Sequence, residues 1–252
     1  MARVLVPLPD RDFDVTEVAV PWKLLTEAGH EVVFATEKGA KPAADPRLLE
    51  GVLFGQLGAE AEPKAFYREL EAAPAFTRPI AWADVDPGAY GAMLLPGGHA
   101  PGMRQYLEGE TLFQRVAAFA KSGKPLGAIC HGVLVLARAK DDATGKSVLA
   151  ARRTTCLPKY MEKTAWMLTG WKLGSYYRTY PEYVEDEVKR ALDDAAKQFE
   201  RGPRVLTKKG TREDDSAAFV VEDGSYLSAR WPGDAYLFGK KLIARLDGRA
   251  PG

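Results

Sequence analysis

The first half of the chain alternates short apolar runs with helical patterns, and this alternation constrains the fold more than any other feature. Residues 3–7 and 31–36 form apolar runs typical of strands, and residues 15–28 between them have a helical pattern. Asp14 and Glu17 have the spacing of a helix N-terminus. Strand, helix and strand in this order predict a mostly parallel sheet with helices on both faces. The expected class is therefore α/β.

Beyond residue 90 the same alternation continues. It predicts strands at 91–96, at 125–129 and in a hairpin over 217–230, with one or two more inside 147–155. It predicts helices at 110–122, 133–139, 158–167, 183–199 and 234–246. The prediction is one domain over residues 1–252.

Residues 37–86 differ in character because prolines interrupt short helical pieces. We interpret this segment as a small Pro-rich insertion or cap within the domain. The prolines that break it up or border it are Pro42, Pro46, Pro63, Pro74, Pro79 and Pro87.

The scarce residues limit the possible chemistry. The chain has two Cys, three His and no Asn, which excludes a Cys-His-Asn triad and N-glycosylation. Two Cys predict no disulfide framework and favour a reducing cytoplasm. A net charge of +1 gives no indication of binding to nucleic acid or to an anionic membrane. No apolar stretch reaches the length of a membrane helix. The expected partner is a small molecule.

The motif that indicates chemistry is Gly-Ala-Ile-Cys-His-Gly at 127–132, between a predicted strand and a predicted helix. Small residues around Cys130 are typical of a nucleophile elbow, a strained turn that lifts a reactive side chain above a sheet. The helix N-terminus is expected to lower the pKa of this thiol, and nearby N–H groups to receive an oxyanion. The alternative is that Cys130 only packs in the core.

Together with the motif around Cys130, two other segments resemble those of a known family. They are Leu-Leu-Pro-Gly-Gly-His-Ala-Pro-Gly at 94–102 and Asp-Val-Thr-Glu-Val-Ala-Val-Pro at 14–21. The chain resembles the ThiJ/PfpI family of the class I glutamine amidotransferase-like superfamily, whose fold is a flavodoxin-like sandwich. The resemblance covers nearly the whole chain and is greatest to the heat-shock glyoxalase III and chaperone branch.

The resemblance implies four catalytic residues. Cys130 is the nucleophile, His131 the base and Glu17 the acid beside the thiol. Glu162 is the best match for the acid that orients His131. From the residues alone, Glu17 could instead complete a capping box, and Glu162 could lie on an exposed helical turn in an ion pair. Asp141 and Asp142 are the other candidates for the orienting acid.

Four further residues are expected around the pocket. Gly97 and Gly98 could supply oxyanion N–H groups or simply form a tight turn. His99 could line the pocket, and Trp231 is expected to narrow its mouth. An aromatic cluster has no role in the family pattern, and we expect it in the core or a subunit interface: Trp166, Trp171, Tyr176, Tyr177, Tyr180 and Tyr183.

The resemblance implies a cofactor-independent enzyme that converts methylglyoxal to lactate or acts as a deglycase. Alternatives are a hydratase or hydrolase of another small electrophile such as an isonitrile or amide, and a holdase chaperone or oxidative-stress sensor. No His follows His131, which argues against a glutaminase with a late His. No metal-ligand motif is visible, so neither a metal nor a cofactor is expected. A homodimer is implied by the resemblance alone.

Overall fold

The computed structural model describes residues 1–51, 57–205 and 207–248, and its centre is a seven-stranded sheet. In chain order its strands are β1 (Arg3–Pro7), β3 (Glu31–Thr36), β5 (Ile80–Ala81), β6 (Ala92–Leu95), β7 (Leu126–Ile129), β8 (Val220–Asp223) and β9 (Tyr226–Ala229). They lie side by side as β5-β3-β1-β6-β7-β9-β8, and all neighbours are parallel except β8 and β9. The predicted α/β fold with a mostly parallel sheet is confirmed.

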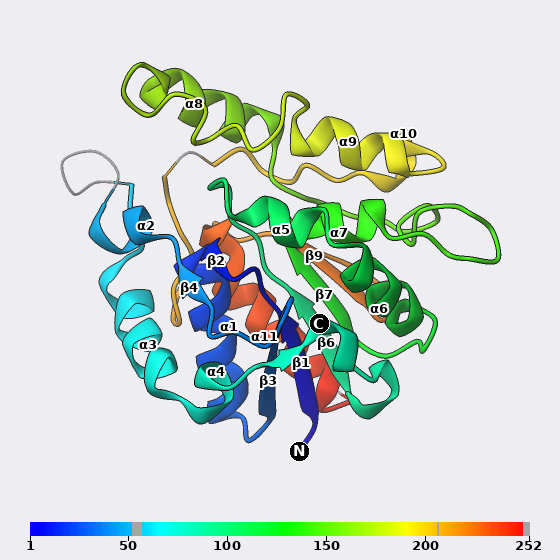
Figure 1. The fold of residues 1–252 in the computed structure, drawn as a ribbon. Helices are drawn as coiled ribbons and strands as arrows, with labels where there is room; N and C mark the ends of the chain where they lie inside the picture. The colour runs from blue at the N-terminus through cyan, green and yellow to red at the C-terminus, as the bar shows by residue number, and fades with distance from the viewer. Residues whose placement is uncertain (52–56, 206, 249–252) are drawn as a thin grey trace.

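Helices cover both faces of this sheet (Figure 1). The longer ones are α1 (Val15–Glu27), α3 (Ala61–Ala72), α6 (Glu110–Ala120), α7 (Gly132–Arg138), α8 (Lys159–Leu173), α9 (Val184–Ala191) and α11 (Ala235–Leu246). The short ones are α2 (Pro46–Glu50), α4 (Pro74–Thr77), α5 (Met103–Leu107), α10 (Ala195–Gln198) and the 3-10 turns η1 (Trp82–Asp84), η2 (Pro87–Ala89) and η3 (Pro232–Asp234). Helix α1 packs between α3 and α11, whereas α7 packs on β6, β7, α5 and α6.

Helices α8, α9 and α10 form a separate layer above the carboxyl ends of the parallel strands (Figure 1). Ligands of open parallel sheets bind at this edge, because the strand-to-helix loops meet there. Residues 174–183, which we name the connecting segment, join α8 to α9 within this layer.

The segment 37–86, predicted as an inserted cap, contributes directly to the main fold. Its strand β5 pairs with β3 at the sheet edge, and its helix α3 packs on α1. A two-residue strand, β4 (Ala43–Ala44), pairs with β2 (Arg11–Phe13) in a second small sheet. Residues 52–56 of this segment lie outside the described part of the chain.

Two predicted elements differ from the structure. The helix expected over 183–199 is divided into α9 and α10, because the backbone N–H of Asp193 donates to Ala150 O at 2.8 Å and leaves the helical path. The strands expected inside 147–155 are isolated bridges, which pair Lys140 with Ser147 and Thr154 with Phe199. The N–H groups of Arg153 and Thr155 donate to the side chains of Asp223 and Ser228 at 3.1 and 2.9 Å, and not to backbone carbonyls, so no ladder forms there.

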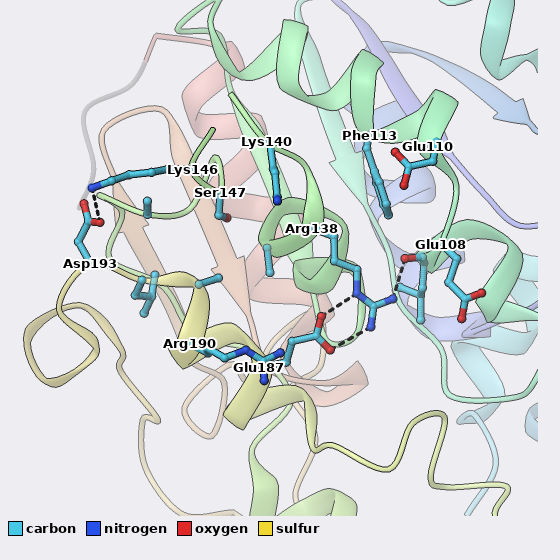
Figure 2. Close-up of a pocket in the computed structure, with 15 residues that line it drawn as sticks. Glu108, Glu110, Phe113, Arg138, Lys140, Lys146, Ser147, Glu187, Arg190 and Asp193 are labelled. Carbon is cyan, nitrogen blue, oxygen red and sulfur yellow. Dashed lines mark hydrogen bonds and ion pairs between the residues drawn. The ribbon is translucent and has the colours of Figure 1, made fainter. Parts of the chain in front are cut away.

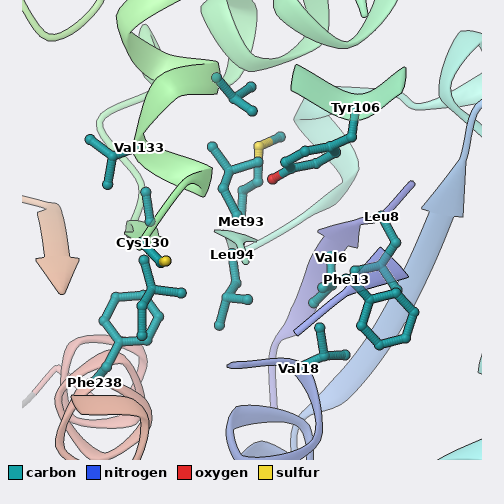
Figure 3. Close-up of a cluster of buried hydrophobic side chains, with 14 of the residues drawn as sticks. Val6, Leu8, Phe13, Val18, Met93, Leu94, Tyr106, Cys130, Val133 and Phe238 are labelled. Carbon is teal, nitrogen blue, oxygen red and sulfur yellow. The ribbon is translucent and has the colours of Figure 1, made fainter. Parts of the chain in front are cut away.

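The apolar core reaches the carboxyl end of β7, where Cys130 lies among buried hydrophobic side chains (Figure 3). The ring of Phe238 on α11 packs against the backbone of Gly127, where an added Cβ would be 2.7 Å from the ring. Burying a phenylalanine of this kind contributes about 2 kcal/mol. None of the described helices combines the length and apolar character needed to cross a bilayer.

Candidate active site

Cys130 occupies a strained turn between β7 and α7. Its φ is +58°, a left-handed conformation that a residue with a side chain rarely adopts. Its N–H donates to Ala229 O at 3.0 Å, which ties the turn to β9. The first residue of α7 has to be glycine, because a Cβ on Gly132 would lie 2.1 Å from Leu95 O. The close approach of α7 to β6 therefore sets the direction of the Cys130 side chain.

The sulfur of Cys130 is nearly closed off from solvent, with the residue 4% exposed. Nδ1 of His131 lies 3.5 Å from Sγ, and the carboxyl of Glu17 is adjacent, with a buried Oε1 that has no hydrogen-bond partner among the described residues. Burial, followed by the adjacent Glu17, raises the pKa of the thiol. Our expectation that the helix N-terminus lowers this pKa is wrong, because a short helix does not offset the loss of hydration of a buried thiolate.

Glu17 points at the sulfur and does not complete a capping box. Asp14 caps α1 by accepting from the N–H groups of Thr16 and Glu17 at 2.8 and 3.1 Å. The N–H of Asp14, which a capping box would give to Glu17, donates to Gly97 O at 2.9 Å. Glu17 is fully buried, and burial followed by the nearby Asp14 raises its pKa well above the ordinary value. Burial therefore favours the protonated, uncharged form of this carboxyl.

The backbone N–H of Gly97, predicted as a possible oxyanion donor, is used by Glu17 in this structure. This N–H donates to Glu17 Oε2 at 2.8 Å. A Cβ on Gly97 would lie 2.7 Å from His131 N and 2.9 Å from Cys130 Cβ, so only glycine permits this close packing. Gly98 has a φ of +152° and packs against the backbone of Asp12. The backbone N–H of His131 remains as the donor that faces the sulfur.

His131 is fully buried and is held by two side-chain contacts. Besides Nδ1 near Cys130, its Nε2 lies 3.2 Å from Thr179 Oγ1, and that hydroxyl donates to His99 O at 2.7 Å. Burial lowers the pKa of His131 to about 3, so the ring is neutral at physiological pH. No sequence signal identified Thr179, because it lies 48 residues from His131 in an irregular segment.

The resemblance implied that Glu162 orients His131, but Glu162 contacts the start of α9 instead. Its carboxylate accepts from the N–H of Val184 at 3.1 Å, at the start of α9, and lies 3.8 Å from Arg178 Nε. Burial raises the pKa of this carboxyl to about 7. The side chain is buried but faces α9, because α8 runs above the sheet and not beside the elbow. The alternative Asp141 accepts from Ala143 N within its own loop.

Part of the aromatic cluster lies against the site. The ring of His99 is stacked on Tyr177 at 4.3 Å and meets Tyr176 edge-on at 4.6 Å. The hydroxyl of Tyr176 donates to the buried carboxyl of Asp45. Burial lowers the pKa of His99 to about 3, and its buried Nε2 has no hydrogen-bond partner in the described part of the chain. His99 therefore fixes the connecting segment over the elbow.

The rest of the predicted cluster is dispersed. Tyr180 packs against Arg138, and Arg178 lies over the ring of Tyr183. Trp166 and Trp171 are 41% and 77% exposed on α8. The connecting segment turns its tyrosines toward the core, whereas α8 leaves its tryptophans exposed, so a subunit interface at these tryptophans stays a prediction.

Trp231 follows β9, the strand beside β7, and is half-buried. Its ring packs on Gly233, where a Cβ would lie 2.4 Å from the ring, and its buried Nε1 has no partner among the residues described. Next to it, fully buried Arg230 and Asp234 form an ion pair of 2.8 Å that fixes the turn after β9. His30 lies elsewhere, at the start of β3, where its Nδ1 accepts from Ala2 N at 3.2 Å.

A separate groove of about 780 Å³ lies between α6, α7 and α9, and the sulfur of Cys130 does not line it (Figure 2). In this groove, Arg138 forms a bidentate ion pair with Glu187, with N–O distances of 2.7 and 2.9 Å. Arg138 also donates to Tyr180 of the connecting segment at 3.0 Å. Across the described residues, no three His, Cys, Asp or Glu side chains are grouped so as to hold a metal ion.

Comparison with known proteins identifies the family of this chain. The family model described as ThiJ/PfpI family-like matches residues 8–203. The deglycase PfpI of Pyrococcus furiosus is 27% identical over 95% of this chain and 96% of its own length. A deglycase of Pyrococcus abyssi is 25% identical over 97% of this chain and 99% of its own.

Among solved structures, glyoxalase III from Candida albicans has the same fold. It superimposes with a TM-score of 0.70 at 18% identity, over 96% of each chain. DJ-1beta of Drosophila melanogaster superimposes with a TM-score of 0.56 at 17% identity, over 98% of this chain and 91% of its own. With its elbow cysteine, the adjacent histidine and a family match over most of its length, this chain belongs to the ThiJ/PfpI family.

Proposed function

We propose that this protein is a cofactor-independent enzyme that uses Cys130 to convert 2-oxoaldehydes such as methylglyoxal into 2-hydroxy acids. The observation that carries the proposal is the pair of uncharged groups around one sulfur. His131 Nδ1 lies 3.5 Å from Sγ as a neutral base, and burial shifts Glu17 beside it toward the protonated form that can act as an acid. A base and an acid at one nucleophile are what carbonyl addition followed by proton transfer requires.

The reaction proceeds by transfer of the thiol proton to His131 as sulfur bonds to the aldehyde carbon. The backbone N–H of His131 and the acid proton of Glu17 stabilise the new oxygen anion. Moving the aldehyde hydrogen as a proton to the neighbouring carbon, through an enediol, gives a 2-hydroxy thioester. Water then cleaves the C–S bond and restores the thiol. One carbon is oxidised and its neighbour reduced, so methylglyoxal and water give lactate without an external oxidant.

Deglycation is the second candidate, because the Pyrococcus relatives are named deglycases. It would require Cys130 to reach a carbonyl adduct on an amino group or guanidinium. The residue is 4% exposed, and the connecting segment contacts both His99 and His131 above it. This closure favours a small free 2-oxoaldehyde over an adduct on the surface of a folded protein.

The test is lactate formation from methylglyoxal by the purified protein, with adducts of methylglyoxal on N-acetyl-arginine as the competing substrate. We expect lactate from the parent protein and a loss of at least about 1,000-fold in Cys130→Ala, because the nucleophile is removed. Cys156→Ala is the matched control, since Cys156 is a fully buried thiol elsewhere in the structure. Undiminished lactate formation by Cys130→Ala would exclude the mechanism. Release of N-acetyl-arginine without turnover of the free aldehyde would favour the deglycase.

A further inference from the structure

The hydrogen bonds of His131 determine which of its ring nitrogens carries the proton. Thr179 has one hydroxyl proton, and its Oγ1 donates that proton to His99 O at 2.7 Å. The same oxygen lies 3.2 Å from His131 Nε2. Because the hydroxyl proton is already used, Oγ1 can only accept from Nε2–H. Nδ1 of the neutral ring is then unprotonated, and it faces Cys130 Sγ at 3.5 Å.

We propose that Thr179 is a positioning residue that holds His131 in the Nε2–H tautomer and so makes Nδ1 the acceptor of the Cys130 proton. The proposal rests on the catalytic role proposed above for Cys130 and His131. It places an uncharged hydroxyl where a histidine base is more often oriented by a carboxylate.

The position of Thr179 is itself fixed from another element. Nε and Nη2 of Arg104 on α5 donate to Thr179 O at 3.1 and 2.7 Å. The residue is buried, with 4% exposure, and the Oγ1 bond to His99 O ties it to the turn that follows β6. Two elements therefore hold this hydroxyl against Nε2, and its orientation does not depend on solvent.

A hydroxyl and a carboxylate have different consequences for the base. A carboxylate beside Nε2 would stabilise the imidazolium, whereas a hydroxyl selects the tautomer without adding charge. The resting sulfur therefore stays a thiol, and its proton moves to Nδ1 only as the substrate is attacked. Removing the hydroxyl leaves Nε2–H without its acceptor and favours the Nδ1–H tautomer, which cannot accept the thiol proton.

The tautomer can be measured directly in the full-length protein by nitrogen NMR of labelled histidine, because protonated and unprotonated ring nitrogens resonate differently. Signals of His131 are assigned by their loss in His131→Gln. We expect Nε2–H in the parent and in Thr179→Ser, and a shift to Nδ1–H in Thr179→Val. A parent protein with the Nδ1–H tautomer would overturn the proposal without any variant having to fold.

Kinetics supply the second readout. For methylglyoxal we expect kcat to fall about 100-fold in Thr179→Val with KM within about twofold, and Thr179→Ser to recover most of the loss. Alkylation of Cys130 by iodoacetamide at pH 7 should slow about tenfold, which is measurable even if methylglyoxal is not the substrate. The matched control is Thr169→Val, because Thr169 is equally buried and donates to Ala165 O in α8. A parental tautomer and alkylation rate in folded Thr179→Val would refute the proposal.

Discussion

Around the sulfur of Cys130, burial favours the uncharged form of every neighbouring side chain. It raises the pKa of the thiol and of Glu17, and it lowers that of His131 to about 3. Three uncharged groups in contact avoid the cost of an isolated buried charge. In the proposed mechanism, the thiolate is therefore formed only as the substrate is attacked.

Glu17→Gln tests the acid at this site. Glutamine can still accept from the N–H of Gly97, as Glu17 does at 2.8 Å, but it has no acidic proton to transfer. We expect kcat for lactate formation to fall about 100-fold while the Tm at pH 7 does not decrease. Glu69→Gln is the control, since Glu69 is exposed and pairs with Lys23. A Glu17→Gln enzyme with parental kcat would remove Glu17 from the mechanism.

At the scale of the element, the start of α7 depends on one glycine. A Cβ on Gly132 would lie 2.1 Å from Leu95 O and 2.6 Å from Pro96 O. Both are backbone atoms, so no side-chain rotation can relieve the clash. Gly132→Ala is expected to cost about 3 kcal/mol in the free energy of unfolding, because α7 must move away from β6.

Gly170→Ala is the matched control for this prediction. Gly170 lies in α8, and its added Cβ would meet only the side chain of Trp166, at 3.2 Å. Alanine is the better helix former, so a gain of up to about 1 kcal/mol is expected. Urea unfolding of both variants measures the difference, and equal stabilities would contradict the packing argument.

We expect the connecting segment to limit access to the sulfur, because it contacts both His99 and His131. Tyr177 stacks on His99 at 4.3 Å, and Tyr177→Ala removes this contact without touching Cys130 directly. We expect alkylation of Cys130 by iodoacetamide to become about tenfold faster, because the segment opens more often. Trp171→Ala should leave the rate unchanged, since Trp171 is 77% exposed on α8. Intact-mass measurement over time follows both variants, and equal rates would mean that the segment does not limit access.

For the whole molecule, buried titratable groups make stability depend on pH in opposing ways. Burial raises the pKa of Asp14 to about 6 and that of Glu162 to about 7, and it also raises that of Glu17 well above its ordinary value. These carboxyls bind protons more tightly in the folded state, so their contribution is lost as pH rises. His99 and His131, with pKa values lowered to about 3, act in the opposite sense below about pH 6.5. We therefore expect the Tm to fall between pH 6.5 and 8.

Glu162→Gln tests whether Glu162 contributes to the decline of the Tm with rising pH without taking part in catalysis. Removing the carboxyl should make the decline shallower and raise the Tm at pH 8 by about 3 °C, because glutamine does not ionise. The kcat for lactate formation should stay within about twofold, since Glu162 contacts Val184 and Arg178 and not His131. Differential scanning calorimetry from pH 5 to 9 measures the slope. A large loss of kcat would restore Glu162 as the partner of the base.

The local features of the fold could be predicted from the sequence. Apolar runs set the strands, Asp14 set the start of α1, and the small residues around Cys130 set a turn with a φ of +58°. Each depends on residues close together in the chain, so periodicity and turn chemistry are sufficient to predict it. The segment 37–86 was harder to interpret, because a two-residue strand such as β5 has no periodicity to detect.

The groups that surround the sulfur could not be predicted from the sequence, because they depend on the tertiary structure. Thr179 and Glu162 lie 17 residues apart near the same layer, yet the hydroxyl meets His131 and the carboxylate meets Val184. Likewise, the direction of the shift in the pKa of Cys130 followed from burial under residues that are remote in the chain. The packing of the layers, and not any local sequence pattern, determines which distant residues come into contact. It also determines which side chains lose their hydration.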